Sequence, residues 1–240
     1  MVATAIILAA GRGIRLRGEH QDKPKGFLVL GEKPIVAESV ERLRAAGIKK
    51  IIIVTGYCAE FYEDFAREND DVVTVHNSKY SESGTMYSLY CALELVEGPF
   101  LLLESDLIYE QRALTVLLDG SPEAILLAGT SDAGDEVWVV TENSHLINMS
   151  KDTDELGAEP SGELVGISRI SVELSLVLRE YAEQEAYQDM LSMAYETGAL
   201  VHAGRHMPIR CPIVPDLIWS EIDDASQLEH ARSKIYPQLA

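Results

Sequence analysis

Basic residues are scarce in this chain. Its 240 residues carry 20 Lys and Arg against 39 Asp and Glu, a formal net charge of −19 at pH 7. This balance argues against general nucleic-acid binding, because phosphate backbones are held mainly by Lys and Arg, and against an anionic membrane surface. An anionic small molecule remains compatible with it, provided that basic side chains gather in one place or a metal ion neutralises the charge.

Cysteines, long apolar runs and paired histidines are also lacking. The three cysteines, Cys58, Cys91 and Cys211, form no CxxC pair, which argues against a disulfide framework and a zinc site of the usual spacing. The apolar run at the N-terminus is about eight residues long and has no basic leader, whereas about 20 apolar residues span a bilayer. The six histidines are dispersed. We therefore expect a cytoplasmic protein whose partners include neither a membrane nor nucleic acid.

Strand-like and helical patterns alternate through the first half of the sequence. Continuous apolar runs such as ATAIILAA and KIIIVT are typical of strands covered on both faces. The predicted strands are 3–10, 50–55, 72–76, 100–104 and 123–128, and the predicted helices are 34–46, 60–68 and 85–96. This alternation predicts βαβ crossovers and hence an α/β fold with a doubly wound, mainly parallel sheet.

The pattern becomes less regular after residue 129. Shorter strands are predicted at 137–141, 145–149 and 163–170, followed by helices at 171–185 and 188–197, a strand at 217–222 and a closing helix from Asp224. No linker or repeat interrupts the sequence, so we expect residues 1–240 to form a single domain. The second half would then be a small mixed region that either covers the strand ends as a lid or offers a dimer surface.

A glycine-rich segment with several arginines follows the first predicted strand. It reads Leu8-Ala9-Ala10-Gly11-Arg12-Gly13-Ile14-Arg15-Leu16-Arg17. In an open α/β sheet, ligands bind beyond the carboxyl ends of the strands, and glycines let backbone N–H groups approach phosphate oxygens. The segment lacks the third glycine of GxGxxG and the Lys-Ser/Thr of a P-loop. These residues alone leave two interpretations, a phosphate-binding loop or a glycine turn with solvated arginines.

A second motif narrows this choice. Residues 22–28 read DKPKGFL and residues 30–34 read LGEKP, and with the glycine loop they resemble the nucleotidyltransferases that make activated sugars and alcohols. The resemblance implies a Rossmann-like nucleotidyltransferase fold, in which residues 8–13 wrap the triphosphate, Arg15 neutralises it and Lys25 contacts the α-phosphoryl group or the attacking oxyanion. Such roles suit phosphoryl transfer, which depends on charge neutralisation and alignment. For Lys25 the alternative is an ordinary solvated lysine.

Acidic residues in two distant segments are candidate ligands for a metal ion. A nucleoside triphosphate arrives with Mg²⁺, which takes oxygen ligands, usually one or two carboxylates together with phosphates and water. Asp106 comes just past a buried strand, and alternation places Glu221 and Asp223 on one face of a late strand. The resemblance implies that Asp106 and Asp223 hold the ion, with Glu221 as a helper. The alternatives are a turn or N-cap role for Asp106 and a cap of the last helix by Asp223 or Asp224.

The segment after the third predicted strand is a candidate for contacting the base. Ser83, Gly84 and Thr85 begin a helix, where N–H groups can meet a base carbonyl or a phosphate; an ordinary capped helix start is the alternative. The segments HNSKYSESGTMYSLYCAL and WSEIDDASQL resemble phosphocholine cytidylyltransferases, and LLLESDLIYE, GDEVWV, MSKD and GELVGISRIS are similar to 2-aminoethylphosphonate cytidylyltransferases. These resemblances imply CTP as the nucleotide, whereas the residues themselves do not distinguish cytosine from uracil.

Most candidate acceptor-binding residues lie in the second half. A primary ammonium needs carboxylates and carbonyls for its three donors, whereas a trimethylammonium group needs an aromatic box. Residues 134–138, GDEVW, offer two carboxylates and one tryptophan, and Val137 stands where choline-type relatives have an aromatic residue. Solvated turn or surface positions and a core tryptophan are the alternatives. The candidates are Tyr80, Asp135, Glu136, Trp138 and Trp219, with Lys151 for a phosphonate or phosphate dianion.

The sequence therefore predicts a cytidylyltransferase that depends on Mg²⁺. The expected reaction joins CMP from CTP to 2-aminoethylphosphonate, by in-line attack of a phosphonate oxygen on the α-phosphorus and release of pyrophosphate. Phosphocholine, or a sugar 1-phosphate with another nucleotide, is the alternative acceptor. A non-catalytic nucleotide-binding regulatory module is the alternative of a different class. The sequence leaves a homodimer open.

Overall fold

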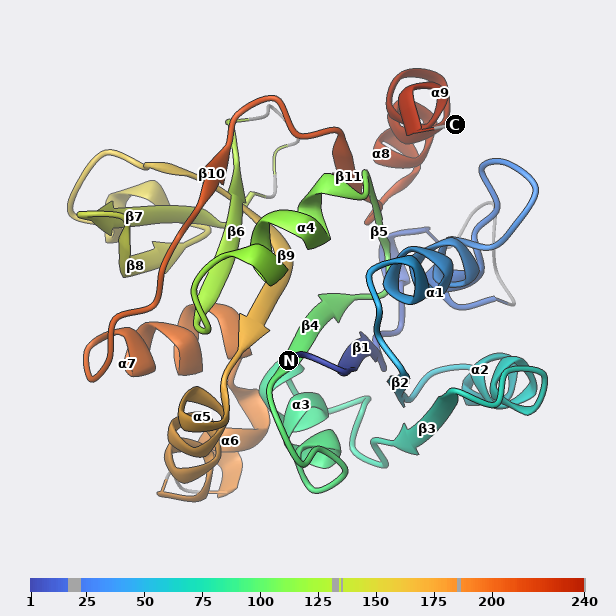
Figure 1. Cartoon of the computed structure of the whole chain (residues 1–240), viewed down its shortest axis with the longest axis horizontal. Coiled ribbons are helices and arrows are strands. Elements are labelled where there is room, and N and C mark those ends of the chain that lie inside the picture. The colour runs from blue at the N-terminus through green and yellow to red at the C-terminus, as the bar shows by residue number, and fades with distance from the viewer. Residues whose placement is uncertain (17–22, 131–133, 135, 185–186, 240) are drawn as a thin grey trace.

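Seven strands that pair in one continuous order make up most of the main sheet. The computed structural model describes residues 1–16, 23–130, 134, 136–184 and 187–239. The strand order is β10-β6-β9-β4-β1-β2-β3, and in Figure 1 this path runs from the side of β7 and β8 to the side of α2. The strands are β1 Thr4–Ala9, β2 Lys50–Thr55, β3 Val72–His76, β4 Phe100–Glu104, β6 Ala124–Ala128, β9 Gly162–Ile170 and β10 Ile213–Val214.

The pairing of these strands is mainly parallel. β1 pairs in parallel with β2 and β4, β2 with β3, and β6 with β10. β9 runs antiparallel between β4 and β6, so the second half of the chain contributes a strand to the middle of the sheet. The predicted fold class, α/β with a mainly parallel sheet and a mixed second half, is confirmed.

Helices cover both faces of the sheet, as the buried strands require. Side chains alternate along β1, so that Ile6 and Leu8 enter one core while Ile7 and Ala9 enter the other. The first core is closed by α3 Thr85–Leu93, α5 Val172–Gln184, α6 Tyr187–Ser192 and α7 Val201–Gly204. The second is closed by α1 Ile35–Ala45, α2 Ala59–Arg67 and α4 Arg112–Asp119.

Several elements differ from the prediction. The helix predicted at 188–197 is confirmed only as far as Ser192, where α6 ends, and a separate π-helix, Tyr195–Leu200, follows after two residues. α3 ends three residues before the predicted boundary. The sequence patterns also missed four short elements: α4, α7, β10 and β5 Leu107–Tyr109. β5, α7 and β10 are too short for a hydrophobic period to be distinguishable from its surroundings, whereas α4 spans eight residues with an amphipathic pattern that sequence reasoning overlooked.

The second half also builds a hairpin and a small separate sheet. β7 Trp138–Glu142 and β8 His145–Ser150 form an antiparallel hairpin that joins the main sheet through β9. β11 Trp219–Glu221 pairs antiparallel with β5, which places the C-terminal segment beside the end of β4. Among the described residues, no helix has the length and apolarity needed to cross a bilayer.

The C-terminal helices pack on the loop that leads into α1. α8 Ala225–His230, the π-helix Ala231–Ile235 and α9 Tyr236–Leu239 close a third, smaller core with Leu28 and Ile35. The Tyr236 hydroxyl donates to Glu38 Oε1 at 2.6 Å. This packing holds residues 221–225 against the loops of the first half.

Candidate functional site

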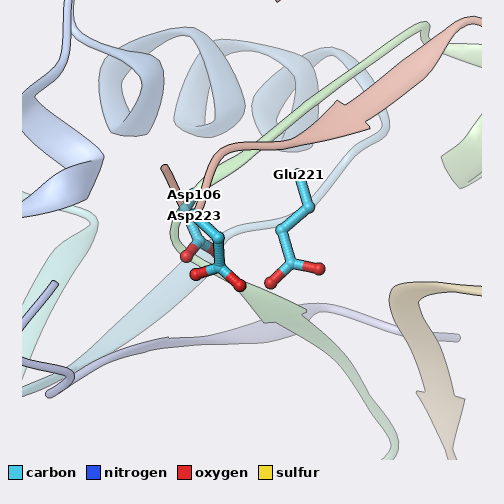
Figure 2. A group of neighbouring side chains, drawn as sticks. All are labelled: Asp106, Glu221 and Asp223. Atoms are coloured by element: carbon cyan, nitrogen blue, oxygen red, sulfur yellow. The ribbon is translucent and has the colours of Figure 1, made fainter. Parts of the chain in front are cut away.

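Three carboxylates from two distant parts of the chain meet at the carboxyl end of β4. Asp106 lies in the turn between β4 and β5, and Glu221 pairs with Leu107 in the β5–β11 sheet. The Ile222 N–H donates to the Asp106 carbonyl at 3.1 Å. One carboxylate oxygen each of Asp106, Glu221 and Asp223 lies within 4.8 Å of the others. Figure 2 shows the three groups extending into the same space, Asp106 from one segment and the other two from the C-terminal segment.

Asp223 and Asp224 have different positions although they are adjacent. Asp224 is the N-cap of α8, and its side chain accepts from the Gln227 N–H at 2.9 Å. Asp223 is 5% exposed and belongs to the carboxylate cluster. β11 ends at Glu221, so Asp223 lies outside the strand and reaches the cluster from the segment between β11 and α8.

Lys25 bridges two of these carboxylates. Its Nζ donates to Asp106 Oδ2 at 2.7 Å and also to Asp223 Oδ1. The Lys25 side chain is 18% exposed, so it is not a solvated surface lysine. Burial by itself lowers the pKa of Lys25, but the charges of Asp106 and Asp223 outweigh burial and the net pKa is raised. Arg15, which is more exposed, donates to Asp223 Oδ2.

Local packing explains why Lys25 is held in this place. Pro24 precedes a 3₁₀ helix, Lys25–Phe27, and the Phe27 ring packs edge-on against Tyr62 with centroids 5.1 Å apart. A Cβ on Gly26 would lie 2.7 Å from the Tyr62 hydroxyl, so only glycine fits between the lysine and this aromatic anchor. The DKPKGFL motif therefore encodes a rigid support for one inward-pointing cation.

The glycine loop borders the site through Lys25. Leu8, Ala9 and Ala10 are buried at the carboxyl end of the central strand β1, whereas Gly11 and Arg12 are exposed. Gly13 has φ +54°, and a Cβ there would lie 3.1 Å from Lys25 Cγ. Glycine is needed at this position both for the left-handed backbone and for the lysine stem. Contact of this loop with a triphosphate remains a prediction.

The candidate base loop is organised by Asn77 and by residues after α6. The buried Asn77 amide donates to Ser83 Oγ and Ser88 Oγ, each at 3.0 Å. The Gly84 N–H donates to the Leu191 carbonyl at 2.5 Å. The N–H donors at this helix start are therefore partly paired within the protein. The Gly84 N–H in particular is not available to a base carbonyl or a phosphate. A role of Ser83, Gly84 and Thr85 in contacting the base remains a prediction.

A cavity of about 1280 Å³ joins these groups. It is lined by Lys25, the three clustered carboxylates, Gly84 and Thr85, and by three of the predicted acceptor residues, Glu136, Lys151 and Trp219. Tyr80 packs instead against Gly56 and His76, and neither Tyr80 nor Trp138 is among the described lining residues. Asp135 lies outside the described residues. The structure thus brings the two halves of the chain together around one space and leaves two predicted acceptor residues outside it.

The cavity carries an excess of negative charge. Among the described lining residues only three are Lys or Arg, namely Lys25, Lys151 and Arg205. Eight are acidic, namely Glu104, Asp106, Glu136, Glu155, Glu163, Glu196, Glu221 and Asp223. A site for anionic substrates with this lining needs further positive charge, from a metal ion or from the substrates themselves.

Sequence reasoning missed four acidic residues of this lining: Glu104, Glu155, Glu163 and Glu196. Burial raises the pKa of the Glu104 and Glu196 carboxyl groups, and for Glu104 the nearby charges of Glu196 and Asp106 raise the pKa further. Glu104 closes the apolar run FLLLE, and a charged residue at the carboxyl end of a buried strand is a signal that could have identified it. Glu196 lies in a segment whose pattern gives no such signal.

The clustered carboxylates suit a divalent cation. Asp106, Glu221 and Asp223 offer hard oxygen donors close together, two of them on buried residues, which is the donor chemistry that Mg²⁺ prefers. Lys25 supplies the compensating positive charge in this structure. The donor set fits Mg²⁺, and binding of the ion here remains a prediction.

Comparison with known proteins identifies relatives among nucleotide-transferring enzymes. A choline-phosphate cytidylyltransferase of Streptococcus pneumoniae is 38% identical over 98 residues, which cover 41% of this chain and 42% of that protein. A 2-aminoethylphosphonate cytidylyltransferase of Lancefieldella rimae is 26% identical over 171 residues, 70% of this chain and 66% of the relative. The solved structure of the inositol-1-phosphate CTP transferase from T. maritima superposes with a TM-score of 0.81 at 20% identity, covering 100% of this chain and 98% of that one.

The family is shown by a match over the first part of the chain. The first curated relatives are matched over only 42%, 51% and 60% of their own length, less than two thirds in each case. The family model, by contrast, matches residues 5–148, more than half of this chain, and includes the glycine loop, Lys25 and Asp106. The chain belongs to the family of the MobA-like NTP transferase domain.

Proposed function

We propose that this protein is a cytidylyltransferase that joins CMP from CTP to a small phosphonate or phosphate acceptor that also carries a positive charge, with 2-aminoethylphosphonate as the first candidate. A phosphonate oxygen attacks the α-phosphorus in line, and the bond from the α-phosphorus to the oxygen that bridges to the β-phosphorus breaks. The electron pair leaves with pyrophosphate. A phosphonate oxygen is already anionic near pH 7, so no general base is required.

One observation carries the reaction class: an inward-pointing lysine and an arginine converge on a carboxylate cluster at the strand ends. Transfer between two anions is limited mainly by charge repulsion and alignment. Lys25 is rigidly supported and can hold an α-phosphate oxygen, while the fork of Arg15 suits two phosphate oxygens. Mg²⁺ bound to Asp106, Asp223 and Glu221 would supply further charge neutralisation. The remaining contribution of the chain is the cavity that holds both substrates side by side.

Two observations support the nucleotide and the acceptor. Relatives that act with CTP recur in both comparisons, and two of them are named for aminoalkylphosphonates, from Lancefieldella rimae and Streptomyces rubellomurinus. The cavity itself is rich in carboxylates, which favours an acceptor with a cationic group over a simple phosphate or a sugar phosphate. Lys151 lies on the same cavity and can hold the phosphonate dianion.

Phosphocholine is the second candidate acceptor. Trp219 lines the cavity, and an aromatic face is what a trimethylammonium group requires. The relative from Streptococcus pneumoniae is named for this substrate. A primary ammonium remains the first candidate because the charged residues among the described lining are mainly acidic.

The test is pyrophosphate release measured over a grid of nucleotides and acceptors. We expect CTP with 2-aminoethylphosphonate to give the highest kcat/KM, with phosphocholine next and sugar 1-phosphates far below. Release with UTP or dTTP and a sugar 1-phosphate alone would contradict the proposal. Tight CTP binding without release across the grid would favour a non-catalytic nucleotide-binding module.

Asp106→Ala tests the metal-binding carboxylates in the same assay. We expect loss of Mg²⁺-dependent release and a Tm in EDTA below that of the wild type, because Lys25 loses one of its two carboxylate partners. Wild-type turnover of this variant at ordinary Mg²⁺ would remove Asp106 from the ligand set.

A further inference from the structure

We propose that Glu104 and Glu196 form the seat for the ammonium group of the acceptor. This inference rests on the proposed function and assigns a substrate contact to two residues outside the carboxylate cluster at Asp106. Both line the cavity, Glu104 from the end of β4 and Glu196 from the π-helix Tyr195–Leu200.

The backbone around Glu104 is shaped to admit its side chain. Gly166, on the neighbouring strand β9, has φ +79°, and a Cβ there would lie 3.2 Å from Glu104 Cγ. A Cβ at this position would crowd the stem of Glu104 and strain the left-handed backbone. A glycine in the middle of a strand otherwise weakens it, so this position indicates that close approach of the glutamate matters.

Glu196 is held by a chain of hydrogen bonds from the start of α3. The Thr85 hydroxyl donates to Glu196 Oε2 at 2.9 Å, and the Tyr195 N–H donates to Thr85 Oγ1 at 3.0 Å. The two glutamates therefore come from different elements but are each fixed in orientation. A carboxylate that is oriented in advance binds a cationic donor without first losing side-chain entropy.

Glu104 has an unsatisfied acceptor. Its Oε1 is sealed from solvent and has no hydrogen-bond partner among the described residues. A buried carboxylate oxygen without a donor is costly, and a cavity-lining residue that keeps one is suited to a ligand that brings donors. A primary ammonium has three N–H donors, enough to reach both glutamates, whereas a trimethylammonium group has none.

The position of Lys151 fits the other end of such an acceptor. Lys151 lines the same cavity and lies close enough to Glu196 to interact with its charge. A site for a phosphonate dianion therefore adjoins the site for an ammonium. This arrangement suits a short zwitterion that carries an anionic and a cationic end.

The experiment compares two acceptors that differ only in the amino group, 2-aminoethylphosphonate and ethylphosphonate. For Glu104→Gln and Glu196→Gln we expect KM for 2-aminoethylphosphonate to rise about 10- to 100-fold, the effect of losing a charge-assisted hydrogen bond in a desolvated site. The KM for CTP and the kcat/KM for ethylphosphonate should stay within twofold of wild type. Glu155→Gln is the matched control, because Glu155 is an exposed cavity-lining carboxylate that accepts from Ser150 Oγ, and this variant should keep the preference for the amino compound.

A measurement on the wild-type protein covers the case in which a glutamine variant fails to fold. Ethylamine should inhibit competitively against 2-aminoethylphosphonate and not against CTP. Retention of the amino preference in both Glu104→Gln and Glu196→Gln would overturn the assignment, as would an equal loss of that preference in Glu155→Gln or a lack of inhibition by ethylamine. No pyrophosphate release by the wild type with any acceptor would instead show that the proposed function has failed, and the assignment with it.

Discussion

Replacing Lys25 by Met removes the ammonium group that bridges Asp106 and Asp223 and keeps most of the side-chain length. The two carboxylates are 12% and 7% exposed, so they lose their partner in a largely desolvated place. We expect three consequences: the protein without metal becomes less stable, Mg²⁺ restores more stability than it does in the wild type, and kcat falls by about 10²–10³ as for other preorganised electrostatic contacts.

The size of the stability loss follows from burial. At an effective dielectric of about 20, each charge pair at about 4 Å is worth roughly 4 kcal/mol before desolvation is subtracted. Breaking a buried pair by removing one partner costs about 3–5 kcal/mol. Arg15 still pairs with Asp223 in the variant, and Lys25 is 18% exposed in the wild type. We therefore expect a loss at the low end of this range, about 3 kcal/mol. For a chain of this size that lowers Tm by roughly 6–12 °C.

Thermal melts in EDTA and in Mg²⁺ measure both effects. Mg²⁺ at about 100 times its Kd stabilises the folded state by about 2.7 kcal/mol, and in Lys25→Met it meets carboxylates that no lysine occupies. Lys33→Met is the matched control, because Lys33 pairs with Glu41 on the surface, where both side chains are 51% exposed, and its Tm should not change. The reasoning would be refuted if Lys25→Met in EDTA had the Tm of the wild type. It would also be refuted if Mg²⁺ raised the Tm of Lys25→Met and of the wild type by the same amount.

Three further predictions concern other parts of the molecule. Gly13→Ala places a Cβ at φ +54° against the stem of Lys25, and we expect about 1–2 kcal/mol less stability and a reduced kcat; unchanged kinetics would show that the loop does not position Lys25. Asp224→Ala removes the N-cap of α8 and should cost about 0.5–2 kcal/mol in urea unfolding with kcat retained, whereas Asp223→Asn should lose activity. Burial raises the pKa of Tyr109 from 10.0 to about 12, although its hydrogen bond to Ser39 opposes the rise. The neutral form is thus favoured in the folded state, so this stability is present below pH 10 and is lost as pH rises through about 12. Tyr109→Phe should flatten that alkaline decline in unfolding free energy, and an identical decline in both proteins would contradict the prediction.

Local sequence patterns predicted the elements that are long or strongly periodic. The run KIIIVT gives β2 as Lys50–Thr55, and PIVAESVERLRAA gives α1 as Ile35–Ala45, because a buried strand and an amphipathic helix each impose a repeat over many residues. The glycine loop and the DKPKGFL segment were recognisable because glycine and proline shape the local backbone there and hold one lysine in place. Their relative positions in space were not encoded in the same local way.

Pairing between distant strands was beyond local patterns. β9 enters the centre of the sheet between β4 and β6, although its residues read like those of any short buried strand. β5 and β11 are three residues each, and they pair across more than a hundred residues of sequence. The partner of a strand is chosen by the packing of the whole sheet, and its own hydrophobic alternation carries no record of that choice.

The sequence by itself determined which chemistry is present: a glycine loop at a strand end, a lysine on a proline- and glycine-bounded support, and acidic residues in two segments. Only the tertiary structure decided how these groups meet. Lys25 and Asp223 are 198 residues apart yet share a hydrogen bond, and Glu104 and Glu196 lie next to each other on a cavity that neither sequence segment predicts. The physical reason is that side-chain type and local period are properties of neighbours in the chain, whereas charge compensation in a desolvated site depends on groups that only the folded sheet brings together.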